Sequence, residues 1–219
     1  DFTCYTLTMA GFAGAKPYPS PSFENWKAGI ATYIKTNKIE KPIVIGHSMG
    51  GGLALALAAD YPDLIGKIVV VDALPCLAAL SNVSFKSKEN NDCSPMVAQM
   101  TAMNETQFYE MQKQAMPRLL QDASKLEMVV DWSVKSDRKT FAQMYCDFFN
   151  TDLRERISTV KCPSLILLAS NFINLKPAIE EQYKNLKTAN FQYANKGLHF
   201  IMYDDKDWYL VQLNNFIKS

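Results

Sequence analysis

Short runs of β-branched and aromatic residues alternate along the chain with longer segments whose apolar positions recur at helical spacing. Runs of the first kind predict strands and segments of the second kind predict helices. The predicted strands are Phe2 to Thr8, Pro42 to Gly46, Ile68 to Asp72, Ser164 to Ala169 and Asn190 to Ala194. This alternation predicts an α/β fold, in which a mainly parallel sheet is flanked by helices.

The helices between these strands have recognisable faces and ends. In the first, Trp26, Ile30 and Ile34 fall on one apolar face, and Ser22 is placed to cap the N-terminus. The second ends before Pro62, because proline disfavours the helical conformation in the residue that precedes it. This second helix covers residues 48–60, and the two remaining ones cover residues 177–187 and 207–218.

Strand signals stop between residues 76 and 152, where predicted helices follow one another. These helices span residues 95–103, 105–116, 119–130 and 138–149. An all-helical stretch between two strands of a parallel sheet predicts a helical cap, so we expect residues 1–75 and 153–219 to form the core and residues 76–152 to form the cap. The cap holds most of the methionines of the chain, namely Met96, Met100, Met103, Met111, Met116, Met128 and Met144. Methionine side chains are flexible, so each of these either fills the core of the cap or lines a deformable apolar pocket. For any single methionine we favour the first interpretation.

Composition narrows the function classes. A formal net charge of +1 gives no broad attraction to nucleic acid, so we expect no nucleic-acid partner. No apolar run approaches the roughly 18 residues of a membrane span, so we expect a soluble chain, either in a bacterial cytoplasm or exported if a preceding segment carries a signal. Five cysteines without a C-x-x-C pair argue against a disulfide scaffold and against a zinc site, and allow at most two disulfides.

The segment with the clearest chemistry is Ile43-Val44-Ile45-Gly46-His47-Ser48-Met49-Gly50-Gly51. It places a G-x-S-x-G motif between an apolar strand and a strong helix-forming run, which predicts a tight strand-to-helix turn with Ser48 at its tip. Gly46 and Gly50 leave room for the strained turn. The N–H of Met49, at the start of the helix, would point at an oxyanion formed on attack by Ser48.

This segment resembles the nucleophile elbow of the α/β-hydrolase superfamily, and most closely that of small lidded bacterial serine hydrolases with G-H-S-M-G-G. The resemblance follows the order of elements along nearly the whole chain. It makes the segment around Gly11 and Phe12 the loop after the family's fourth strand, and implies that these two residues and His47 contact substrate. It also implies that the first three strands are absent, together with the loop that carries the second oxyanion donor.

A histidine base must be one of two residues, since the chain contains only His47 and His199. His47 lies inside the elbow and should point away from Ser48. His199 follows the last predicted strand, where the family carries its catalytic histidine, so we predict it as the base.

Several residues could be the acid that pairs with His199. The family's usual position, after the strand at residues 164–169, holds Asn171 and Asn174 but no carboxylate. Asp72 ends the preceding strand and either orients His199 or caps the turn that follows. Asp147 and Asp205 are lesser candidates.

These residues predict a serine hydrolase acting on an apolar, small-molecule ester or related acyl substrate through Ser48, His199 and Asp72. Hydrolysis of a peptide, a lactone or a carbon–carbon bond is the alternative within enzymes, because one site serves many substrates. A non-catalytic ligand-binding relative is the alternative outside them. No metal or organic cofactor is implied, and the oligomeric state is left open.

Overall fold

The computed structural model describes residues 2–219. Within this range, four parallel strands form one sheet in the order β1-β2-β3-β4. The strands are β1 (Ile43–His47), β2 (Lys67–Val71), β3 (Ser164–Leu168) and β4 (Ala189–Tyr193). The helices are α1 (Phe23–Thr36), α2 (Met49–Asp60), α3 (Ser94–Thr101), α4 (Glu105–Ala115), α5 (Leu126–Val134), α6 (Arg138–Phe149), α7 (Lys176–Gln182), α8 (Ile201–Asp204) and α9 (Lys206–Lys218). Short 3-10 helices are η1 (Leu77–Leu80), η2 (Met116–Arg118), η3 (Ala123–Lys125), η4 (Arg156–Thr159) and η5 (Ser170–Leu175).

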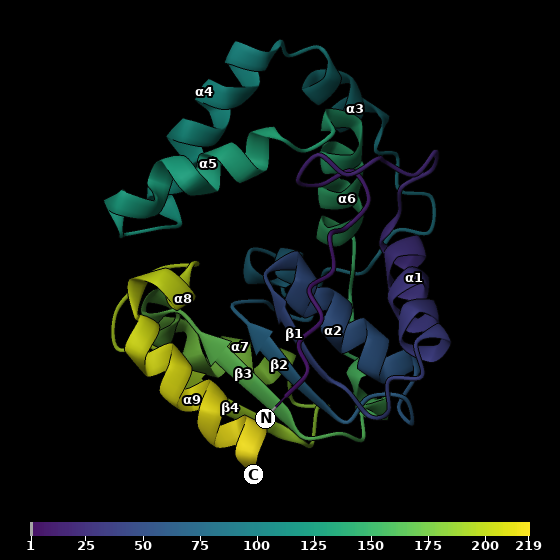
Figure 1. Ribbon diagram of the computed structural model, residues 1–219, viewed down its shortest axis with the longest axis vertical. Helices are drawn as coiled ribbons and strands as arrows, with labels where there is room; N and C mark the ends of the chain where they lie inside the picture. Colours follow the sequence, from purple (N-terminus) through teal and green to yellow (C-terminus); the bar gives the residue numbers. More distant parts are fainter. Residues whose placement is uncertain (1) are drawn as a thin grey trace.

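Helices cover both faces of the sheet, which explains why β2 and β3 read as continuous apolar runs. Ile68 and Val70 face one layer, whose buried residues come largely from α1, α2, α6 and α7. Val69 and Val71 face the other, where side chains of α9 pack. Figure 1 shows α1 and α2 on one side of the strands and α9 on the other. The predicted α/β architecture is therefore confirmed.

The first predicted strand is wrong. Residues 2–9 have no regular secondary structure and are mostly exposed, and Phe2 has 63% of its surface in solvent. A strand is stabilised by pairing, and this segment is not hydrogen-bonded into the sheet, whose edge strand is β1. The exposed Ile45, at 46%, marks this uncovered edge.

Between β2 and β3 the described chain is helical, with α3 to α6 as its main elements; we call α3 to α6 the inserted helices. Figure 1 shows them on the side of the sheet that lies beyond the ends of its strands. The predicted helix over residues 119–130 is wrong in its bounds, because residues 119–122 are not helical and form the turn that joins η2 to η3, while α5 begins at Leu126. A disulfide between Cys93 and Cys146 ties the start of α3 to α6, a pairing that the cysteine spacing did not predict.

Candidate active site

Ser48 occupies a sharp turn between β1 and α2. Its backbone has φ 55° and ψ −123°, a conformation that costs a residue with a side chain about 1–3 kcal/mol and is typical of functional sites. Gly46 makes the turn possible, since a Cβ there would meet the carbonyl oxygen of Gly50 at 2.0 Å. The expectation that Gly50 also provides room is wrong, because a Cβ at Gly50 would meet nothing within 4 Å.

The elbow is joined to the end of the neighbouring strand and to the start of α2. The N–H of Ser48 donates to the carbonyl oxygen of Val71 at 2.9 Å, while its own carbonyl accepts the N–H groups of Gly51 and Gly52. Met49 is the first residue of α2. Its N–H belongs to the group of N-terminal donors that find no acceptor within a helix and that favour a nearby anion.

Asp72 directly follows β2 and has a buried carboxylate, with 3% of the side chain exposed. Oδ1 accepts the backbone N–H of Ala169 at 2.7 Å, and Oδ2 lies 2.6 Å from Nδ1 of His199. The backbone of Asp72 has φ 47°, a region that residues with a side chain rarely adopt. The carboxylate thus bonds the chain that leaves β3 and also the loop between β4 and α8. We call this loop, residues 194–200, the histidine loop.

His199 lies beside the elbow. Its ring centroid is 4.5 Å from that of His47, the residue before Ser48. An ionised carboxylate only accepts hydrogen bonds, so Nδ1 of His199 carries a proton toward Asp72. In the neutral ring this leaves Nε2 as the basic nitrogen, and with 22% of the side chain exposed the ring is half-buried.

His47 is held as a neutral ring. Burial, reinforced by the nearby ring of His199, lowers the pKa of His47 from 6.5 to about 3, although its hydrogen bond to the His199 backbone opposes this shift. That bond joins Nε2 of His47 to the carbonyl oxygen of His199 at 2.9 Å. Because a carbonyl accepts, Nε2 of His47 is the donor. This hydrogen bond joins the elbow to the histidine loop.

The other candidate acids bond elsewhere. Asp147 accepts from the backbone N–H of Phe23 at 3.2 Å, between α1 and α6. Asp205 accepts from the N–H of Lys196 at 3.3 Å. Asn171 and Asn174 lie in η5. Of the carboxylates weighed from the sequence, Asp72 is the one hydrogen-bonded to His199.

The loop around Gly11 and Phe12 packs against the inserted helices. The N–H of Gly11 donates to Ala15 and that of Phe12 to Met9, so both donors are used inside the loop. The carbonyl of Gly11 accepts from Asp137, just before α6, and the Phe12 ring lies 6.2 Å from that of Phe141.

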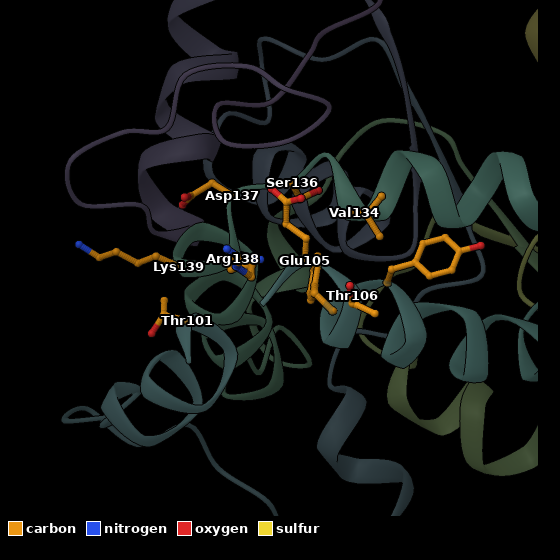
Figure 2. Close-up of a pocket in the computed structure, with 10 residues that line it drawn as sticks. Thr101, Glu105, Thr106, Val134, Ser136, Asp137, Arg138 and Lys139 are labelled. Atoms are coloured by element: carbon orange, nitrogen blue, oxygen red, sulfur yellow. The ribbon is translucent and has the colours of Figure 1, made fainter. Parts of the chain in front are cut away.

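A cleft of about 700 Å³ lies among the inserted helices (Figure 2), and Asp137, whose N–H donates to Gly11, is one of its lining residues. Figure 2 shows Glu105 and Arg138 at its centre, and Ser136 beside them. Ser48, Asp72 and His199 are not among its lining residues. Across residues 2–219 no group of three or more His, Cys, Asp or Glu side chains is arranged to hold a metal ion. No helix in that range combines the length and apolar character of a membrane span.

Residues 1–206 match the family model described as alpha/beta hydrolase fold. The mouse (Mus musculus) sn-1-specific diacylglycerol lipase ABHD11 is 23% identical over 217 residues, which cover 93% of this chain and 68% of the relative. An abhydrolase domain-containing protein of Schizosaccharomyces pombe is 44% identical over 43 residues, but that match covers only 20% of this chain and 16% of the relative.

Solved structures agree on the fold. The enol-lactonase of Burkholderia xenovorans superposes with a TM-score of 0.74 at 18% identity, over 94% of this chain and 76% of that one. An esterase of Exiguobacterium antarcticum superposes with a TM-score of 0.75 at 13% identity, over 95% of this chain and 79% of that one.

Proposed function

Since the chain belongs to the α/β-hydrolase fold family, we propose that it is a serine hydrolase that cleaves an ester or related acyl substrate with Ser48, His199 and Asp72. The observation that carries the proposal is the 2.6 Å contact between Asp72 and Nδ1 of His199, on a ring that lies against the elbow residue His47. This contact fixes the histidine tautomer whose free Nε2 can accept a proton.

The reaction follows the acyl-enzyme route. The Oγ of Ser48 attacks the substrate carbonyl carbon while Nε2 of His199 takes the hydroxyl proton. Asp72 stabilises the resulting imidazolium, and the N–H of Met49 donates to the oxyanion. Collapse breaks the bond to the leaving group, which receives the proton from His199. A water molecule, deprotonated by His199, then attacks the acyl-enzyme and releases the acid and the free serine.

The proposed substrate is apolar. In the same proposal, residues 76–152 act as a cap over the core formed by residues 1–75 and 153–219. Support comes from an aromatic stripe on α6, where the ring of Tyr145 lies 4.5 Å from that of Phe141 and 6.4 Å from that of Phe149. Tyr145 and Phe149 are exposed at 37% and 44%, and a contiguous exposed apolar patch is a feature of ligand-binding surfaces. The name of the mouse relative, a diacylglycerol lipase, points to the same class.

Lactone hydrolysis is a second candidate, because a lactone is a cyclic ester open to the same attack and one structural neighbour is an enol-lactonase. Peptide and carbon–carbon bond hydrolysis have no comparable support. The loop at Gly11 and Phe12 is the observation that supports the non-catalytic alternative. Its two N–H groups are hydrogen-bonded within the loop and supply no second oxyanion donor.

Steady-state assays with p-nitrophenyl butyrate and p-nitrophenyl decanoate, beside a simple lactone, test the proposal. We expect ester turnover that His199→Ala lowers by several orders of magnitude. Asn195→Ala, at an exposed position of the same loop, serves as the control and should leave turnover within about twofold. Ligand binding without turnover of either ester or lactone would favour the non-catalytic alternative.

A further inference from the structure

One carboxylate joins the histidine loop to the inserted helices. Oδ1 of Asp204 accepts the backbone N–H groups of Gln121 at 3.0 Å and Asp122 at 2.9 Å. Oδ2 accepts the N–H of Leu198 at 2.9 Å and shares the Gln121 donor at 3.1 Å. Gln121 and Asp122 lie in the turn between η2 and η3, and Figure 1 shows the segment that joins α4 to α5 on the side of α8. Leu198 directly precedes His199.

The residue on the other side of His199 is bonded to the same turn. The N–H of Phe200 donates to the carbonyl oxygen of Leu119 at 3.1 Å. His199 is therefore held on both flanks, through Leu198 and Asp204 on one side and through Phe200 on the other. The carbonyl of His199 accepts from Nε2 of His47, so the backbone on either side of the ring and at His199 itself is hydrogen-bonded to other elements.

An apolar cluster strengthens this junction. Met116 and Leu120 are buried with Val129 and Val130 of α5. Phe200 and Tyr203, from the histidine loop and α8, pack against these residues. The turn between α4 and α5 thus presents apolar side chains and backbone donors to the same short stretch, residues 198–204.

We propose that Asp204 is a positioning residue that sets the orientation of the His199 ring by tying its loop to the turn at residues 119–122. The proposal rests on the proposed role of His199 as the base. Under this proposal, the placement of His199 depends on the position of the inserted helices. Displacement of the turn at residues 119–122 would break the bonds of Leu198 and Phe200 together.

The substitution Asp204→Asn separates this role from simple packing. Asparagine keeps the size of aspartate but has one acceptor oxygen, and its amide nitrogen only donates. It can therefore accept from the turn or from Leu198, but not from both at once. Asp207→Asn is the matched control, since Asp207 lies three residues further on, is exposed, and has the same charge.

Two readouts on folded protein test the proposal. The first is the rate at which a fluorophosphonate labels Ser48, which should fall about ten- to hundredfold in Asp204→Asn and stay unchanged in Asp207→Asn. The second is the downfield NMR signal of the Nδ1 proton of His199, in protein labelled with 15N-histidine. With two histidines in the chain, this signal is readily assigned. It should weaken or broaden in Asp204→Asn alone.

A folded Asp204→Asn protein with an unchanged labelling rate and an unchanged His199 signal would overturn the proposal, whatever its melting temperature. If Asp204→Asn does not fold, Asp204→Glu keeps the charge but moves the carboxylate by one methylene, and the same two readouts decide, with change supporting the proposal and constancy overturning it. Wild-type protein that never reacts with the probe contradicts the proposed function instead, and the NMR signal then tests the link between Asp204 and His199 by itself.

Discussion

Asp72→Asn isolates the charge that faces His199 while keeping the shape of the side chain. The backbone N–H of Ala169 needs an acceptor at 2.7 Å, so the amide oxygen of the new asparagine should turn toward Ala169. Its amide nitrogen then faces Nδ1 of His199 and donates to it. This arrangement moves the ring proton to Nε2, the nitrogen that accepts the proton of Ser48 in the proposed mechanism, so the variant holds the wrong tautomer for that mechanism.

The size of the effect follows from the distance. Two unit charges 2.6 Å apart attract by about 6 kcal/mol at an effective dielectric constant of about 20. Loss of the corresponding carboxylate in the best-studied serine triad lowers turnover about 10⁴-fold, or about 5 kcal/mol at 1.36 kcal/mol per factor of ten. The two values agree, so we expect a loss of about 10⁴ in kcat.

The assay is steady-state hydrolysis of p-nitrophenyl butyrate by folded variant and wild type. Asp147→Asn is the control, because Asp147 also accepts a backbone N–H but does so between α1 and α6. It should keep turnover within about twofold once corrected for folded protein. A loss below about tenfold for Asp72→Asn would refute the reasoning and assign the orientation of His199 to another group.

Three further predictions concern the stability of the fold. His47 has a folded pKa of about 3 against an ordinary 6.5, so below pH 6.5 the unfolded chain binds a proton that the folded chain does not. Between pH 6.5 and 5 the wild type should therefore lose about 1.6 kcal/mol more unfolding free energy than His47→Gln, as measured by urea denaturation; equal losses would contradict the neutral ring. Gly46→Ala should unfold the elbow or abolish activity, whereas Gly50→Ala, at an open helical position, should change the melting temperature little; the reverse ranking would contradict the account of the turn. Replacing Cys93 and Cys146 together by Ser should lower the unfolding free energy by about 2–4 kcal/mol, because their disulfide spans 53 residues; the same midpoint in urea with and without the pair would show that it does not constrain the chain.

The local features of the site could be predicted because they depend on neighbouring residues. The apolar runs at residues 43–47 and 67–71 identify strands, and the glycines around Ser48 identify the turn between a strand and a helix. In a parallel sheet, a carboxylate at the end of β2 lies at the same sheet edge as the end of β1, the strand that precedes Ser48. For that reason Asp72 could be named from the sequence, although its contact with His199 could not be distinguished from a turn cap.

Features that depend on distant partners could not be predicted. Phe2 to Thr8 has the composition of a strand, yet a strand needs a neighbour to pair with, and composition does not reveal one. The bonds of Asp204 to Gln121 and Asp122 join residues more than 80 positions apart. The disulfide of Cys93 with Cys146 likewise depends on how α3 and α6 pack, since an odd number of cysteines leaves several pairings open.

The central claim is that Ser48 is an activated nucleophile, and covalent labelling tests it most directly. Wild-type protein is incubated with a fluorophosphonate probe, and the modified residue is located by peptide mass spectrometry beside Ser48→Ala and the site-remote control Ser94→Ala. We expect one adduct per chain, on Ser48, in the wild type and in Ser94→Ala, and none in Ser48→Ala. Labelling that persists in Ser48→Ala, or a folded wild-type protein that takes up no probe, would contradict the claim.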